Sequence, residues 1–264
     1  MKNLEALSFC TVVKYKSDKT YTSNFENSPR PCHNLAFMLE GEAIITTQNN
    51  EIRVKKGEIL FIPKNSTYSS IWKADKTCVY QSVHFNFLPN NDPFLSKETP
   101  IQTIETSEFE ELFKICETVK EYQFSNGYNF FLYLSAFYNL CSKLLYKVKT
   151  EEKKEINPSI KPAILYIETY YNKPCKVQEL ANLCYLSPSR FFYLFKKYIG
   201  CSPIVYKNKV AIQKAACDLL LNKNISIEQV AYENGFSNPI YFRRLFKKIT
   251  GKTPSQYRKQ TYLN

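Results

Sequence analysis

The hydrophobic positions change their period along the chain, and the change divides the sequence into two parts. Residues 30–87 hold short runs rich in β-branched and aromatic residues, with partial alternation of apolar and polar positions. Gly41, Gly57 and the turn sequence Pro63-Lys64-Asn65 separate these runs. Many short strands in succession predict a small antiparallel barrel or sandwich.

Two helical patterns follow the strands, at residues 107–121 and 128–147, where apolar residues recur every three or four positions. Such helices can pack on the barrel or pair with a second copy of the chain. The most apolar stretch, residues 130–146, is interrupted by Asn139 and Lys143 and is too short for a membrane span. The first ten residues include Glu5 and lack a long apolar run, so we expect neither a signal peptide nor a membrane partner.

A polar segment, residues 149–159, reads as a linker, and the sequence beyond it repeats one phrase. Residues 189–206 read "SRFFYLFKKYIGCSPIVY", and residues 239–258 read "PIYFRRLFKKITGKTPSQYR". Both contain Phe-x-x-Leu-Phe-Lys-Lys-x-x-Gly-x-x-Pro-x-x-Tyr. The repeat predicts two equivalent helical units.

The second copy has the signals of a helix-turn-helix motif. Ser226 can cap a first helix, and Gly235 supplies the positive φ of a sharp turn. Ser237 or Asn238 can then cap a second helix, in which the apolar residues are spaced to face the core. The second helix would therefore present its remaining side chains to the major groove, where arginine can donate two hydrogen bonds to guanine.

The first copy has the same kinds of signal. The two copies together predict helix-turn-helix motifs at about 176–198 and 226–249. The first copy differs at Tyr185, which replaces the turn glycine, and its exposed face has aromatic residues where the second copy has two arginines. The predicted DNA-contacting residues of both copies are Ser187, Ser189, Arg190, Phe192, Tyr193, Lys196, Lys197, Ser237, Asn238, Ile240, Tyr241, Arg243, Arg244, Lys247 and Lys248.

A helical pattern of nineteen residues, 203–221, lies between the two copies. At 1.5 Å per residue it would span about 28 Å. This length is close to the roughly 34 Å between successive major-groove segments on one side of a duplex. The two motifs would then form one bipartite reader of DNA, whereas a single motif of this kind could instead be a protein-binding helical hairpin.

Charge separates the two parts in the same way. Residues 1–156 carry 19 basic and 19 acidic residues, whereas residues 157–264 carry 17 basic and 5 acidic residues, so the whole net charge of +12 lies in the second part. This separation indicates a polyanionic partner, which we expect to be double-stranded promoter DNA. The nine cysteines include no Cys-x-x-Cys pair, which favours reduced thiols and a cytoplasmic protein.

These residues resemble the AraC/XylS family of bacterial transcription regulators. The most specific stretch is "SIEQVAYENGFSNPIYFRRLFKKITGKTPSQYR", residues 226–258. The chain departs from the family pattern at Tyr185 and at Lys209-Val210, where an Arg-Leu pair is common. The resemblance implies a sequence-specific regulator, an activator that works with RNA polymerase.

The first part is similar to the cupin-like sensing barrel of many members of that family. The similar stretches are residues 30–46, 54–68 and 83–87, with Tyr68 where a histidine is frequent. This resemblance implies an α+β chain of two domains: a cupin-like effector-binding and dimerisation domain (1–148), a linker (149–159) and an all-α DNA-binding domain (160–264). A small-molecule effector and a homodimer are also implied.

Enzymatic chemistry has little support in the sequence. A metal-dependent barrel enzyme needs several histidines and a carboxylate around one ion, and this chain has two histidines and no His-x-His. We therefore expect no metal, no cofactor and no catalytic residue. If the polar strand faces point inward, the candidate effector-binding residues are Arg30, His33, Tyr68, Trp72, Tyr80 and His84.

Three alternatives stay open. The barrel could be an enzyme that the basic part tethers to nucleic acid, or it could bind another protein instead of a small molecule. The sequence "PCHN", residues 31–34, resembles the acceptor-cysteine motif of DNA alkyltransferases, with Cys32 as the acceptor.

Overall fold

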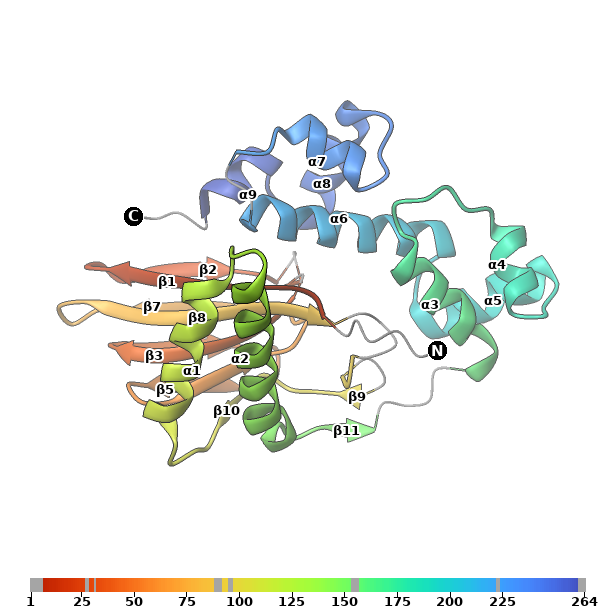
Figure 1. Cartoon of the computed structure of the whole chain (residues 1–264). Coiled ribbons are helices and arrows are strands. Elements are labelled where there is room, and N and C mark those ends of the chain that lie inside the picture. The colour runs from red at the N-terminus through yellow and green to blue at the C-terminus, as the bar shows by residue number, and fades with distance from the viewer. Residues whose placement is uncertain are drawn as a thin grey trace. The chain divides into compact units, whose positions relative to one another are not determined.

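The computed structural model describes residues 7–26, 29–30, 32–87, 92–94, 97–152, 157–221 and 224–260. These residues fall into two compact units, the first with strands β1–β8, β10 and helices α1 and α2, the second with helices α3–α9 (Figure 1). No helix among the described residues is long and apolar enough to cross a bilayer.

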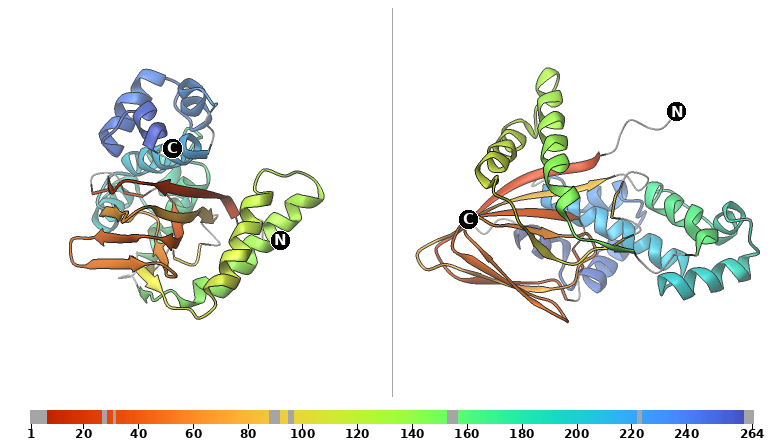
Figure 2. Two further views of the ribbon diagram at one scale, coloured as in Figure 1. Left: turned by 90° about the vertical axis from the view of Figure 1, so that its left-hand side faces the viewer. Right: turned by 90° about the horizontal axis from the view of Figure 1, so that it is seen from below.

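Antiparallel strands build the first unit (Figure 2). In the described part of the chain they form a five-stranded sheet of order β1-β8-β3-β6-β10 and a four-stranded sheet of order β2-β7-β4-β5. A short ribbon pairs β9 with β11. The strands are β1 (Leu7–Ser17), β2 (Tyr21–Asn24), β3 (His33–Glu40), β4 (Glu42–Thr46), β5 (Glu51–Lys55), β6 (Ile59–Ile62), β7 (Ser69–Lys73), β8 (Cys78–Phe87), β9 (Lys97–Glu98), β10 (Gln102–Ile104) and β11 (Glu151–Glu152).

Side chains from both sheets form the interior of this unit. Alternate residues of β3 and β8, such as Met38 and Tyr80, contribute to the cluster, together with Ile45 of β4 and Trp72 of β7. Because side chains alternate between the faces of a strand, the intervening residues of β3 and β8 face the other side of the sheet. Each of these two strands therefore contributes one face to the interior between the sheets and the other face to the opposite side of the five-stranded sheet.

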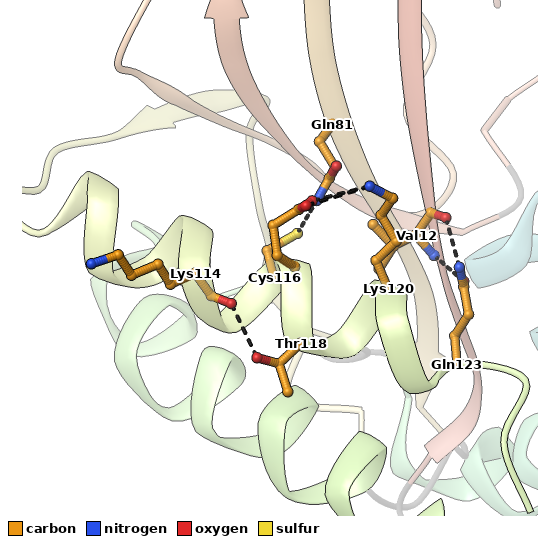
Figure 3. A network of polar contacts seen from close by, with 8 residues as sticks. Val12, Gln81, Lys114, Cys116, Thr118, Lys120 and Gln123 are labelled. Atoms are coloured by element: carbon orange, nitrogen blue, oxygen red, sulfur yellow. Dashed lines mark hydrogen bonds and ion pairs between the residues drawn. The ribbon is translucent and has the colours of Figure 1, made fainter. Parts of the chain in front are cut away.

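Helices α1 (Phe109–Tyr122) and α2 (Tyr128–Leu144) lie together on one side of the strands (Figures 1 and 2), followed by the short helix η2 (Leu145–Lys147). Phe37 and Phe85, from the outward face of the five-stranded sheet, contact aromatic rings of α1 and α2 respectively. Polar contacts add to this packing (Figure 3): Gln81 Nε2 lies 3.2 Å from Cys116 Sγ, and Gln123 Oε1 accepts from the backbone N–H of Val12.

The second unit is helical. Its elements are η3 (Pro158–Ile160), α3 (Lys161–Thr169), α4 (Val177–Leu183), α5 (Pro188–Ile199), α6 (Pro203–Leu221), α7 (Ile227–Glu233), α8 (Pro239–Thr250) and α9 (Pro254–Gln260). Figure 1 shows α3–α5 at one end of α6 and α7–α9 at the other. The first unit consists of antiparallel sheets, and the helical second unit contains the pairs α4–α5 and α7–α8. This arrangement confirms the predicted fold class.

Local sequence signals account for the ends of helices α5 and α8. Ser187 Oγ accepts from the backbone N–H of Arg190 to begin α5, and Asn238 Oδ1 accepts from two backbone N–H groups to begin α8. A proline occupies the first turn of each helix. Gly200 and Gly251, with φ of 79° and 74°, end the two helices in the left-handed conformation that glycine adopts without strain.

Candidate nucleic-acid interface

The helix-turn-helix motif of the second copy consists of α7 and α8. Phe242 and Phe246 are fully buried against α6, and Val230 of α7 belongs to the same cluster. With one face of α8 fixed in the core, the opposite face is exposed to solvent. At 100° per residue, Ile240, Arg244 and Lys247 lie at the centre of that exposed face.

The two arginines of α8 are in different environments. Arg243 lies at the edge of the exposed face and forms an ion pair with Glu228 of α7. Arg244 is exposed, and no hydrogen bond or ion pair joins its side chain to another described residue. At the other edge of the face, Tyr241 Oη accepts from Asn208 Nδ2 of α6 at 3.4 Å. Of the two arginines, Arg244 therefore has the guanidinium that lies at the centre of the exposed face and is available to a ligand.

The first motif, α4 and α5, has the same arrangement with different chemistry. Phe191 and Phe195 are buried, and Tyr193 occupies the central position that Arg244 has in α8. The Tyr193 ring is 54% exposed and lies between two cations, with Arg190 Cζ at 5.7 Å and Lys197 Nζ at 6.0 Å from its centroid. This helix therefore presents an aromatic ring with positive charge on both sides.

All fifteen residues predicted to contact DNA are exposed on α5, on α8 or at their N-termini. The structure brings them together as two surfaces of one helical unit. The side chains of Ser187 and Asn238 cap their helices, so these two residues act on helix geometry as well as on the exposed surface.

The turns of the two motifs share a backbone conformation. Gly235 has φ of 83° and Tyr185 has φ of 54°, so the tyrosine adopts a left-handed conformation that favours glycine. Tyr185 is 96% exposed, which shows that its side chain has no packing role among the described residues.

Most of the candidate effector-binding residues form a cluster inside the first unit. Arg30 donates from Nη1 to Tyr68 Oη at 2.6 Å and from Nη2 to His84 Nδ1 at 3.2 Å. Rings of Trp72 and Tyr80 stack at 3.8 Å between centroids. We call Arg30, Tyr68, Trp72, Tyr80 and His84 the interior polar cluster.

His33 does not belong to the interior polar cluster, which corrects that part of the prediction. Its ring stacks on Phe85 at 5.4 Å and on Phe61 at 6.0 Å, on the sheet face that packs against the helices. Its Nδ1 accepts from the backbone N–H of Lys64. Because His33 and Asn34 are neighbours in β3, they point to opposite faces, and Asn34 contacts His84 instead.

Hydrogen bonding fixes the protonation of His84. Arg30 and Asn34 Nδ2 are obligate donors toward His84 Nδ1, so this atom is the acceptor and the proton is on Nε2, 3.3 Å from Tyr15 Oη. Burial lowers the pKa of His84, which keeps the imidazole neutral.

Sequence reasoning missed Tyr15 and Tyr21, which extend the interior polar cluster. Tyr15 stacks on Tyr80 at 4.7 Å, and Tyr21 Oη donates to Tyr80 Oη at 2.6 Å. Tyr15 pairs directly with Tyr80 in the register of β1 and β8. Each of the strands β1, β2 and β8 contains one tyrosine. The sequence alone does not show that the three rings meet, because strand pairing and register are tertiary properties.

Arg30 has unusual surroundings for a buried charge. Its Nε is buried and without a hydrogen-bond partner in the described structure, and none of the described carboxylates pairs with the guanidinium. Phe25 covers one face at 5.2 Å. No group of three or more His, Cys, Asp or Glu side chains in the described ranges could hold a metal ion.

Comparison with known proteins extends this description. Residues 180–260 match the family model of a helix-turn-helix domain. The chain is 25% identical over 260 residues to the Msm operon regulatory protein of Streptococcus mutans, a match that covers 94% of this chain and 91% of that protein. The chain is therefore a DNA-binding transcription regulator whose helix-turn-helix domain is of the AraC type.

Other relatives of this chain are regulators too. The lactose operon transcription activator of Staphylococcus xylosus is 28% identical over 143 residues, and the match spans about half of each protein, 53% of this chain and 51% of that one. ToxT from Vibrio cholerae has the same fold, with a TM-score of 0.64 and 15% identity over 97% of this chain and all of that one.

Proposed function

We propose that this AraC/XylS-family regulator activates transcription by placing α5 and α8 in successive major-groove segments of promoter DNA. The observation that carries the proposal is the pair of exposed faces, both basic, on two helices whose opposite faces are buried against the shared helix α6. In this arrangement Arg244 reads a guanine through two hydrogen bonds, while Lys247, Lys248, Lys196 and Lys197 bind phosphates.

The first motif reads DNA differently. Tyr193 and Phe192, which is 41% exposed, suit contact with a thymine methyl group, and the cations on either side of Tyr193 suit the phosphates next to it. The site on DNA is therefore asymmetric, with a half that contains guanine under α8 and a half rich in A·T pairs under α5. The name of the Staphylococcus xylosus relative supports activation, which we assign to contact with RNA polymerase at the promoter.

The test is selection of duplexes from a random pool by the full chain, followed by fluorescence anisotropy over a range of salt concentrations. We expect one bipartite sequence, and log affinity that falls linearly with log salt by about 0.9 for each phosphate contact. Selection of no preferred sequence, or binding that is insensitive to salt, would contradict the proposal.

The interior polar cluster is the site that we propose for a small-molecule effector. A buried guanidinium with an unused Nε donor is costly unless an acceptor meets it, and an effector with such an acceptor supplies one. Tyr80 and Trp72 offer ring faces to the rest of the molecule. An Arg30→Lys chain should keep DNA affinity but lose its response to effector in a promoter reporter, whereas the neighbouring surface change Lys64→Ala should keep both.

A homodimer is the assembly that we propose, with α2 at its interface. Tyr128, Phe131 and Tyr138 are 78%, 68% and 36% exposed, and with Ser135 and Ser142 they line one face of α2 without a charge. Their spacing, alternately three and four residues, is typical of helices that pair along their length, and a second copy presents the same face. Sedimentation should show a dimer that Phe131→Glu dissociates and that Tyr146→Glu, outside α2, leaves intact.

We assign no catalytic activity to the chain. Cys32 lies 3.9 Å from His84 Nδ1, but it is 1% exposed, so its thiol cannot reach an alkylated base in a duplex. A regulator that binds the chromosome acts in the cytoplasm, and we place the protein there.

A further inference from the structure

Tyr171 connects the two helix-turn-helix motifs independently of α6. It follows α3, which belongs to the first motif's core, but its ring packs against the hydrophobic clusters of both motifs. Lys214 of α6 lies over this ring, with Nζ at 5.8 Å from the centroid. Tyr171 is partly buried between the two cores, and this burial raises its pKa to about 12.

Asn172 makes a second connection, at the turn of the second motif. Its Nδ2 donates to the backbone carbonyl of Glu233, the last residue of α7, at 3.3 Å. The backbone of Asn172 lies so close to Gly235 that a Cβ there would come within 2.5 Å of the Asn172 carbonyl oxygen and 2.7 Å of its Cα. The segment between α3 and α4, which leads into the first motif, therefore lies directly against the turn that joins α7 to α8.

These contacts lie beside the point where α6 passes from one core to the other. Val210 belongs to the cluster of the first motif, and Ala211 belongs to that of the second. A single helix fixes the distance between two domains but resists rotation about its own axis only through the packing at each end. Tyr171 and Asn172 supply contacts off that axis, so they resist the rotation that α6 alone permits.

We propose that Tyr171, Asn172 and Gly235 form a brace that fixes the spacing and angle of α5 relative to α8, and so makes the chain selective for one separation of its two half-sites on DNA. These are positioning residues, since none of them lies on the exposed faces of α5 or α8. The proposal rests on the bipartite reading of DNA that we propose above.

One inserted base pair moves a half-site by about 3.4 Å along the duplex and about 34° around it. A rigid pair of reading helices cannot follow this change, so one helix loses its base contacts. Loss of one bidentate contact lowers affinity by about five- to 150-fold. A pair without the brace can rotate and keep both sets of contacts, at the expense of weaker binding to the original site.

The experiment uses the full chain and the duplex that it selects from a random pool, with one base pair added or removed between the half-sites. The brace variants are Gly235→Ala and Tyr171→Ala. Their matched controls are Gly251→Ala, whose added Cβ meets no atom within 4 Å at a similar φ of 74°, and Tyr171→Phe, which keeps the ring. Circular dichroism checks that each variant keeps its helices.

The wild-type chain and both controls should bind the altered duplexes about five- to 150-fold more weakly than the original, and the brace variants should lose most of that difference. Because Gly235→Ala also strains the turn, Tyr171→Ala decides the result if the glycine variant does not fold. Folded brace variants that keep the wild-type discrimination would overturn the brace. A wild-type chain that selects no bipartite site overturns the proposed function instead.

Discussion

Replacing Arg244 by lysine tests base reading separately from charge. Lysine keeps the positive charge and much of the reach of arginine, but it lacks the planar fork that donates two hydrogen bonds to one guanine. Arg244 lies at the centre of the exposed face of α8, and its side chain has no partner among the described residues. The substitution therefore removes a bidentate contact and leaves the electrostatic attraction to phosphates.

The magnitude follows from the contact that is lost. A bidentate contact to a base contributes about 1–3 kcal/mol of discrimination, which corresponds to about five- to 150-fold in affinity between the right base pair and a wrong one. Arg244→Lys should abolish this difference at one position of the site and leave the salt dependence unchanged. Arg243→Lys should leave the base preference unchanged, because Arg243 is paired with Glu228 at the edge of the face. This ion pair is half exposed, at 48% on both sides, so its loss should change the free energy of unfolding by only about 0–1 kcal/mol.

The assay is fluorescence anisotropy with the selected duplex and with every single-base change under α8, at two salt concentrations. Lys248→Ala is the control for a phosphate contact, and it should weaken binding to all sequences by the same factor. If Arg244→Lys keeps the base preference of the wild-type chain while Arg244→Ala weakens every sequence equally, Arg244 contacts only phosphate and the assignment is wrong.

Three further changes test the rest of the molecule. Tyr185→Gly should raise the free energy of unfolding by about 0.5–1 kcal/mol, because relief of left-handed strain exceeds the added chain entropy of glycine, as measured by urea denaturation. Since burial lowers the pKa of His84, the unfolded chain binds its proton first, and stability should fall as pH drops below the unfolded value of about 6.5. Trp72 fluorescence should report unfolding in this measurement, and His84→Gln should reduce the loss of stability at low pH. Cys32→Ser should leave DNA binding and promoter activity unchanged, whereas loss of regulation would favour an acceptor cysteine.

The sequence predicted the elements that have strong local signals. Helix caps, turn glycines and the three- and four-residue spacing of apolar positions that begins at Phe191 and at Phe242 are local features of the sequence. The helices of both motifs could therefore be predicted from the sequence. The sheet face on which His33 lies could not be predicted, because the polar residues 33 and 34 show no clear alternation at the start of the strand. Nor could sequence separate Arg243 from Arg244, since the ion pair with Glu228 depends on how α7 crosses α8.

The different turn residues of the two motifs have a physical explanation in their surroundings. Both turns require a positive φ, which costs a tyrosine about 1–2 kcal/mol but does not prevent folding. At Tyr185 the side chain extends into solvent, so the conformational strain is the whole cost. At Gly235 the Asn172 backbone occupies the space that any Cβ would need, so every other residue would also force the two segments apart. Glycine at 235 is therefore required by the contact with Asn172, and the turn alone does not require it.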